Sequence, residues 1–425
     1  MTRDQTEEAR VGLSRTRGAC PSLFAPMETG DGLLARIVPS GAMALEAFAA
    51  LCAAARTHGN GLMEITARGS LQVRGLTEIS APRFAEAVET LGVSFNDRIP
   101  VIASPLPSNS AAGFQPQELA KIIRTQIARR DLKLAPKVSV VVDDCGPISL
   151  DGLTADIRLR LGASTTASRV LLSLGGDVET AVPLGATRPE DAAEVAVDLL
   201  VALSLSGSDA RVHDVIAQEG VDRFVRAAGA RLEATGKRIS PRATETIGLH
   251  PLGGDACAIG VALPFSQAHA LDLIALARIA EANGAAWVAL APQRTLLLGP
   301  IGEMTAFALG TAADTLGFIV DARDARRRIA ACAGAPACAA GHIAARALAA
   351  RIAERLPQGD FALHISGCSK GCAHPKPAPL TIMGTAQGAR VIEGDSVLHL
   401  PISSAYTDEF VEDIARRVAV ENEDA

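Results

Sequence analysis

The feature that most constrains this chain is an internal duplication. A strand, a helix and two further strands are predicted over residues 33–74, and the same order returns over residues 259–298. Two pairs of matching positions keep nearly one offset: Ser70 with Thr295, 225 positions apart, and Cys145 with Cys368, 223 positions apart. Alternating helices and strands in an alanine-rich chain can resemble each other by chance. Two landmarks at nearly one offset favour duplication instead.

The duplication predicts two halves, each with a small α/β unit followed by a larger one. Long Ala-, Glu- and Asp-rich helices between residues 188 and 237 close the first half. The expected divisions are a mobile N-terminus at 1–17, small units at 18–80 and 241–308, and larger units at 81–240 and 309–425.

Composition limits the class of protein. Hydrophobic residues make up 48% of the 425 residues and charged residues 21%, which predicts a large buried core and excludes global disorder. The formal charge of −6 gives no support for a nucleic-acid or anionic-membrane surface. The first 17 residues are mixed in charge, and no apolar run reaches 18 residues, so we expect a cytoplasmic protein without a membrane span.

Four of the eight cysteines form two close pairs near the C-terminus. The pairs are Cys332-x5-Cys338 and Cys368-x3-Cys372. Four thiolates suit a 4Fe-4S cluster, which takes one cysteine per iron, or a tetrahedral zinc ion. Structural zinc sites favour shorter spacings than the five-residue gap, so the pattern favours the cluster. Buried free cysteine is the alternative reading, and we prefer it for Cys52 and Cys257.

These cysteine pairs, together with the duplicated architecture, resemble the siroheme-dependent nitrite and sulfite reductases over nearly the whole chain. The resemblance implies an α+β fold with a pseudo-twofold axis. Each half would pair a ferredoxin-like unit with a larger α/β unit that binds the cluster or a tetrapyrrole. It also implies that Cys332, Cys338, Cys368 and Cys372 ligate a 4Fe-4S cluster.

Within this superfamily the chain is most similar to the precorrin-3B synthase family. The similarity rests on two stretches, residues 17–36, which contain Gly30-Asp31-Gly32, and residues 364–375 around the second cysteine pair. It implies an oxygen-dependent monooxygenase of aerobic cobalamin synthesis. Such an enzyme hydroxylates precorrin-3A at a meso carbon, and an acetate side chain closes a γ-lactone to give precorrin-3B.

The chain departs from the reductases at their oxyanion site. Reductases present two lysines, one residue apart, whereas this chain has Lys137 and then Ser139. A second lysine, Lys370, lies between the last two cysteines, where reductases carry a neutral amide. Because a small oxyanion needs concentrated positive charge and proton donors, the loss of one cation argues against nitrite or sulfite reduction. Lys137 and Lys370 are the candidate catalytic residues.

A precorrin carries eight carboxylates and needs cationic partners. The candidates for substrate binding are Arg36, Arg68 and Arg74, of which Arg68 matches the arginine of the reductases' macrocycle-facing hairpin. Any one of them could instead be a solvated surface charge. His364 and His374 flank the last cysteine pair and could ligate a mononuclear iron or move protons, although each alone is more often structural.

Three functions remain open at this stage. The leading one is the tetrapyrrole monooxygenase, with precorrin-3A and dioxygen as partners. The second is a siroheme-dependent nitrite or sulfite reductase, and the third is a non-catalytic protein with a cysteine-ligated zinc ion or cluster. No Gly-x-Gly-x-x-Gly follows a strand, so nicotinamide electrons are expected through a separate reductase. The oxygen-activating centre could be a mononuclear iron, a siroheme-like group or the cluster.

Overall fold

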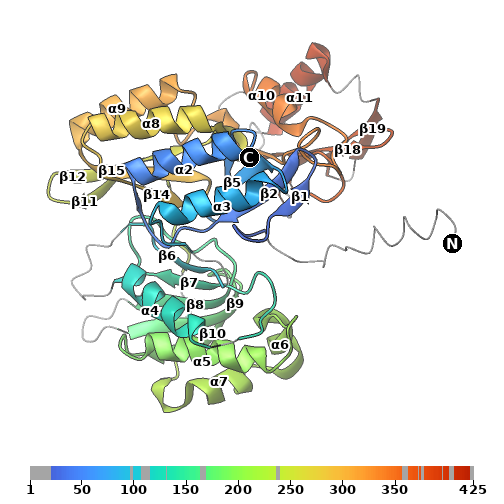
Figure 1. Ribbon diagram of the computed structural model, residues 1–425. Helices are drawn as coiled ribbons and strands as arrows, with labels where there is room; N and C mark the ends of the chain where they lie inside the picture. Colours follow the sequence, from blue (N-terminus) through green and yellow to red (C-terminus); the bar gives the residue numbers. More distant parts are fainter. Residues whose placement is uncertain are drawn as a thin grey trace, which may run out of the picture. The chain divides into compact units, whose positions relative to one another are not determined.

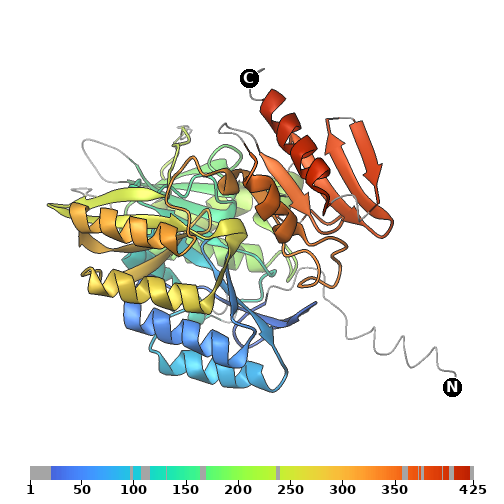
Figure 2. The same cartoon turned by 90° about the horizontal axis from the view of Figure 1, so that it is seen from above.

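A computed structural model describes residues 21–421 of the chain, apart from residues 96–98, 107–114, 131, 163–168, 236–239, 357–361, 372, 375–377, 395 and 402–405. The chain forms two compact units (Figures 1 and 2). One unit contains residues 96–243, and the other joins residues 23–95 to residues 244–425. We call them the inserted unit and the main unit. None of the helices in the described ranges is long and apolar enough to cross a membrane.

The main unit contains two antiparallel sheets of five strands with matching topology. The first has the order β1-β2-β5-β4-β13, formed by Met27–Thr29, Gly32–Ile37, Leu71–Leu76, Leu62–Ile65 and Gln267–His269. The second has the order β11-β12-β15-β14-β3, formed by Gly248–Gly253, Ala256–Ala262, Thr295–Gly302, Trp287–Ala291 and Met43–Ala44. The matching orders confirm the duplication predicted from sequence.

Each sheet takes its last strand from the other repeat. β13 pairs with β4, with Ala268 opposite Met63, and β3 pairs with β14, with Met43 opposite Val288. Both exchanged strands immediately precede a helix. The exchange ties the two repeats together through backbone hydrogen bonds, so neither sheet is complete without the other repeat.

Four helices of the main unit lie side by side in the order α9, α8, α2, α3 (Figures 1 and 2). Their bounds are Glu303–Thr315, Ala270–Ala282, Leu45–His58 and Ser80–Thr90. In α2 the buried residues Phe48, Leu51, Cys52 and Ala55 follow the i, i+3, i+4, i+7 spacing of one helix face. In α8 the buried residues Leu273, Leu276, Ala277 and Ala280 repeat that spacing 225 positions later. The two helices pack on each other in one core.

The boundaries of the small units differ from those expected from sequence. Phe84 and Val88 of α3 are fully buried in the same core as α2, so the first small unit extends to Phe95 rather than to residue 80. Leu309 of α9 lies in this core too, so the second extends past residue 308. The amphipathic faces of α3 and α9 can be buried only against these sheets and helices.

The rest of the main unit is a mixed sheet with the order β16-β17-β18-β19-β20. The strands are Ile329–Ala331, Leu363–Ser366, Leu380–Thr385, Gly388–Glu393 and Ser396–Leu400. The first three run parallel and the last two antiparallel. Helices α10 (Ala345–Ala353) and α11 (Asp408–Glu421) pack on each other, and their buried side chains share a core with this sheet.

The inserted unit contains a separate mixed sheet with the same arrangement of strands, in the order β10-β9-β8-β7-β6. Its strands are Val182–Thr187, Arg169–Gly176, Ala155–Gly162, Val140–Asp143 and Val101–Ala103. Helices α4 (Pro116–Ala128), α5 (Ala192–Ser204) and α7 (Asp222–Ala228) bury one face, while α6 (Val212–Glu219) contacts β8 and β9. Cys145 follows the end of β7 by two residues, as Cys368 follows β17. The two cysteines therefore occupy equivalent positions in the two repeats.

Candidate metal centre

Two of the predicted cluster ligands lie at one edge of the parallel part of the last sheet. Cys332 follows β16 directly, and Cys368 follows β17 by two residues. These strands are parallel neighbours in which Ala331 pairs with Ile365. The carboxyl ends of parallel strands meet at one edge, so their cysteines lie close together. The amide N–H of Gly367 donates to the Cys332 sulfur over 3.0 Å.

Glycines allow the two cysteine loops to touch. A Cβ atom on Gly367 would lie 2.8 Å from the Cα atom of Gly334 and 3.4 Å from the Cys332 sulfur. A Cβ atom on Gly341 would lie 2.7 Å from the carbonyl carbon of Gly334. Any larger residue at these positions would push the loops apart.

Cys338 lies in a turn that is held by backbone hydrogen bonds within the first cysteine loop. Its amide donates to the carbonyl of Gly334 at 2.8 Å, and its own carbonyl accepts from Gly341 at 2.8 Å. The amide of His342 then donates to the carbonyl of Gly367 at 2.7 Å. The loop that holds Cys338 is thus hydrogen-bonded to the loop that leads to Cys368.

The donor set suits an iron-sulfur cluster. Cys332, Cys338 and Cys368 are free, half-buried thiols, and the fourth predicted ligand, Cys372, lies outside the described residues. Within the described ranges, no three His, Cys, Asp or Glu side chains are grouped so as to hold a single metal ion. A 4Fe-4S cluster takes one cysteine per iron, so these three thiols and Cys372 would make a complete set of ligands. Cys52 and Cys257 are buried and free, as expected.

Arg74 joins the first ferredoxin-like sheet to the Cys338 loop. Its side chain is 4% exposed, and it donates to Asp31 over 2.8 and 3.0 Å and to the carbonyl of Ala337. Glu64 lies 3.4 Å from the same guanidinium and accepts a hydrogen bond from Arg346 at 2.8 Å. Burial lowers the pKa of Arg74, but Asp31, Glu64 and Cys338 outweigh it and raise that pKa.

The Gly30-Asp31-Gly32 turn presses directly against the same loop. The amide of Gly30 donates to the carbonyl of Ala337 at 3.2 Å, and a Cβ atom on Gly30 would lie 2.5 Å from the carbonyl oxygen of Pro336. Sequence analysis singled out this turn and Arg74, but it missed their link to the cysteine loop. The glycines on both sides of a lone carboxylate were the available signal.

Histidines 364 and 374 face each other beside the second cysteine loop. Their ring centroids are 5.9 Å apart, and His364 is 5% exposed. The Nε2 atom of His364 is buried and has no hydrogen-bond partner among the described residues. Burial and the neighbouring His374 lower the pKa of His364. Both effects favour the neutral form of the ring.

The other predicted site residues lie in different settings. Arg36 on β2 is half-buried, and its Nε atom has no partner among the described residues. Arg68 is half-buried in the turn between β4 and β5, and Lys370 is exposed between the cysteines. Lys137 is exposed in a left-handed conformation before β7, in the inserted unit. The structure gathers Arg36, Arg68, Arg74 and Lys370 in the main unit with the cysteines.

Comparison with known proteins identifies the fold of the chain. Residues 25–91 match the nitrite/sulfite reductase ferredoxin-like half domain. The structure of NirA from Mycobacterium tuberculosis superposes with a TM-score of 0.68 over 87% of this chain and 75% of that one, at 17% identity. The fold is therefore that of the nitrite and sulfite reductases, as the sequence predicted.

Two curated proteins resemble the chain along most of its length. A precorrin-3B synthase from Sinorhizobium sp. is 36% identical over 95% of this chain and 88% of its own. A ferredoxin–nitrite reductase from Synechococcus elongatus is 22% identical over 87% of this chain and 80% of its own. The chain belongs to the precorrin-3B synthase family within the nitrite and sulfite reductase superfamily. This confirms the family that the motifs predicted.

Proposed function

We propose that this protein converts precorrin-3A to precorrin-3B with dioxygen. One oxygen atom enters the macrocycle as a hydroxyl group on a meso carbon, and an acetate side chain closes the γ-lactone. The second oxygen atom leaves as water and takes up two electrons from a reduced nicotinamide through a separate reductase, together with two protons. The observation that carries the proposal is the 36% identity to a precorrin-3B synthase over almost the whole chain.

The cluster ligands in this proposal are Cys332, Cys338, Cys368 and Cys372. A bound 4Fe-4S cluster would supply electrons one at a time. The chain supplies the enclosure, since the glycine-lined loops bring backbone N–H groups to the cysteine sulfurs, as Gly367 does to Cys332 at 3.0 Å. Because free thiols persist in a reducing compartment, we also propose that the enzyme works in the cytoplasm.

The cluster assignment has its own test. Cys338→Ser removes one ligand, so iron and acid-labile sulfide per protein should fall well below the wild-type content. Cys52→Ala is the matched control, because Cys52 is a free thiol packed in the α2 core. Equal iron in the Cys338 variant and the wild type would remove Cys338 from the ligand set. Zinc in place of iron in the wild type would favour the non-catalytic alternative.

Arg36, Arg68 and Lys370 are proposed to bind the carboxylates of the macrocycle. All three lie in the unit that carries the cysteine loops, with Arg36 and Arg68 half-buried and Lys370 exposed. Arg74 differs, since Asp31 and the Ala337 carbonyl use its hydrogen-bond donors. We therefore propose Arg74 as a positioning residue for the Cys338 loop rather than as a substrate ligand.

Ser139 supports the monooxygenase over the reductase. Its side chain is 2% exposed, and its amide donates to Asp156 at 3.0 Å. The position is therefore part of a packed strand start and presents no second cation beside Lys137. The test compares turnover of precorrin-3A under oxygen with reduction of nitrite and of sulfite by one cluster-loaded preparation. Rapid reduction of either anion with no turnover of precorrin-3A would favour the reductase.

A further inference from the structure

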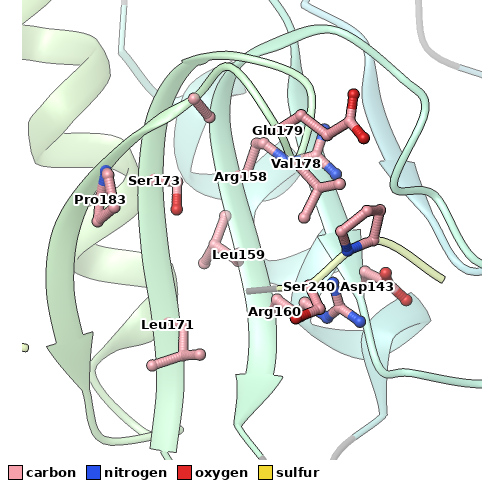
Figure 3. A pocket seen from close by; sticks show the side chains of 12 residues that line it. Asp143, Arg158, Leu159, Arg160, Leu171, Ser173, Val178, Glu179, Pro183 and Ser240 are labelled. Atoms are coloured by element: carbon pink, nitrogen blue, oxygen red, sulfur yellow. The ribbon is translucent and has the colours of Figure 1, made fainter. Parts of the chain in front are cut away.

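The inserted unit contains a cavity that the proposed function does not use. It lies on the side of the β7–β10 sheet away from the α4 and α5 core and has a volume of about 250 Å³ (Figure 3). Its polar lining includes Asp143, Arg158, Arg160, Ser173, Glu179 and Ser240. Three of these side chains, Asp143, Arg158 and Arg160, are buried.

Arg158 is a buried cation that makes no direct contact with a carboxylate among the described residues. It is 6% exposed, and its guanidinium donates to the carbonyl oxygens of Leu150, at 3.0 Å, and of Leu153. No carboxylate oxygen of the described residues lies within 4.0 Å of it. Burial lowers the pKa of Arg158 more than the carboxylates of Asp151, Asp143 and Asp177 raise it from a longer distance. A buried charge without an ionic partner is costly, so an anion in the cavity would stabilise this arginine.

The neighbouring arginines take up the buried carboxylates near Arg158. Arg160 donates to Asp151 at 2.7 Å and to the Cys145 sulfur at 3.2 Å. Arg242 donates to the carbonyl of Cys145 at 2.7 Å, and its guanidinium lies 3.6 Å from Asp143 and 4.0 Å from Asp151. Both buried carboxylates thus pair with Arg160 or Arg242, whereas Arg158 forms no such ion pair within the described part of the chain.

Asp143 adds a polar group that can face an anion. It is 1% exposed, and its Oδ1 atom accepts from the Cys145 amide at 3.0 Å and from the Ser104 hydroxyl at 3.2 Å. Its Oδ2 atom is buried and has no partner among the described residues. Burial raises the pKa of Asp143 against the opposing effect of Arg160 and Arg242, and in a protonated form Oδ2 would donate a hydrogen bond. Glu179 lies at the exposed rim, where solvent screens its charge.

The residues around Cys145 differ from the equivalent residues around Cys368 in the other repeat. Cys145 is equivalent to Cys368, but its sulfur accepts from Arg160 and donates to the carbonyl of Leu161 at 3.4 Å. Arg160 pairs with Asp143 across β7 and β8, as Met383 pairs with Ser366 across β17 and β18. The first repeat therefore carries arginines where the second has uncharged side chains.

We propose that this cavity binds the carboxylate group of a small organic acid, with Arg158 as its main ionic partner. The planar guanidinium fork matches a carboxylate in a bidentate geometry. The carboxylate belongs either to a free acid or to a side chain of a tetrapyrrole. The site lies entirely within the inserted unit and does not depend on the proposed oxygenation.

Calorimetric titration of the full-length protein with succinate tests the site. We expect one succinate per chain and at least tenfold weaker binding by Arg158→Met. Arg169→Met is the matched control, because Arg169 lies on β9 in the same sheet and pairs with Glu233 at 3.0 Å. Ser173→Leu fills the cavity without removing a charge, so it should weaken binding as well, and it decides the outcome if Arg158→Met does not fold.

Competition identifies the source of the carboxylate. Displacement of succinate by uroporphyrin III, which carries eight carboxylates, would assign the site to a tetrapyrrole side chain. Retention of succinate would assign it to a free acid. Both results support the carboxylate site. Absence of succinate binding to the wild type, equal binding by the wild type and both cavity variants, or binding of inorganic phosphate without succinate would each overturn it.

Discussion

The guanidinium of Arg74 donates to both carboxylate oxygens of Asp31, at 2.8 and 3.0 Å, and to the carbonyl of Ala337, the residue before Cys338. Arg74 and Asp31 come from the first ferredoxin-like sheet, whereas Cys338 comes from the second repeat. The Arg74–Asp31 ion pair therefore connects the two repeats at the Cys338 loop.

Replacing Arg74 should disturb both stability and the metal centre. Arg74→Met leaves the half-buried Asp31 without its cation, while Glu64 keeps Arg346. Because loss of one partner of a fully buried pair typically costs about 3–5 kcal/mol, the unfolding free energy should fall by up to that amount. The Cys338 loop also loses its anchor, so iron content should fall. Urea unfolding and iron analysis measure the two effects. Arg56→Met, at an exposed position near the end of α2, is the control, and an equal result for both variants would contradict the positioning role.

Gly367→Ala should separate the two cysteine loops. The added methyl group would lie 2.8 Å from the Cα atom of Gly334, and such overpacking typically costs about 1–3 kcal/mol. Cluster absorbance should decrease with it. Gly302→Ala adds the same methyl group into open space and should change neither quantity. A Gly367 variant with wild-type absorbance and stability would show that the loops do not need this close contact.

Arg68→Ala should weaken binding of precorrin-3A about tenfold or more, because a charged hydrogen bond to a carboxylate is lost. The unfolding free energy should change by less than about 1 kcal/mol, since Arg68 is only half-buried in a turn. Arg83→Ala, on the exposed side of α3, is the control. Binding measured by quenching of protein fluorescence that is equal in wild type and variant would exclude Arg68 from the substrate site.

Protonation of the buried His250 ring should lower the stability of the fold in mild acid. The ring is buried on β11 and hydrogen-bonded to the carbonyl of Thr246 at 3.1 Å, and burial lowers its pKa below the usual 6.5. The unfolded chain therefore binds a proton first, and stability falls as the pH drops below 6.5. Thermal unfolding at pH 7.5 and 5.5 should show a smaller drop for His250→Gln than for the wild type. Identical drops would contradict this assignment.

The sequence predicted the parts of the fold that leave a repeated pattern. The repeated order of elements and two pairs of positions, Ser70 with Thr295 and Cys145 with Cys368, were enough to infer the duplication. The buried positions of α2 do return in α8 after 225 positions. The exchange of β3 and β13 was not predictable, because strands of two and three residues are too short to show a periodicity. The boundary at Phe95 was missed because the packing partner of α3 is α2, which the local sequence does not reveal.

Part of the candidate site could be predicted from the sequence. The cysteine spacing pointed to two loops, and the structure brings these loops together through the Gly367 amide and the Cys332 sulfur. Ligation of a cluster by the four cysteines stays a prediction. The role of Arg74 depends on a contact with Ala337, 263 positions away, and pairwise contacts over that distance leave no local signal. Arg158 passed unnoticed for the same reason, since an arginine in a strand looks like a surface charge until its burial is known.

The fate of dioxygen distinguishes the proposed monooxygenase from a reductase. The cluster-loaded enzyme, an electron-donating reductase and precorrin-3A would be incubated under dioxygen labelled with oxygen-18, and the product analysed by mass spectrometry. The account predicts one labelled oxygen atom in each product molecule, and no product without dioxygen. Product formed with unlabelled oxygen only, or no product while the same preparation reduces nitrite or sulfite rapidly, would contradict it.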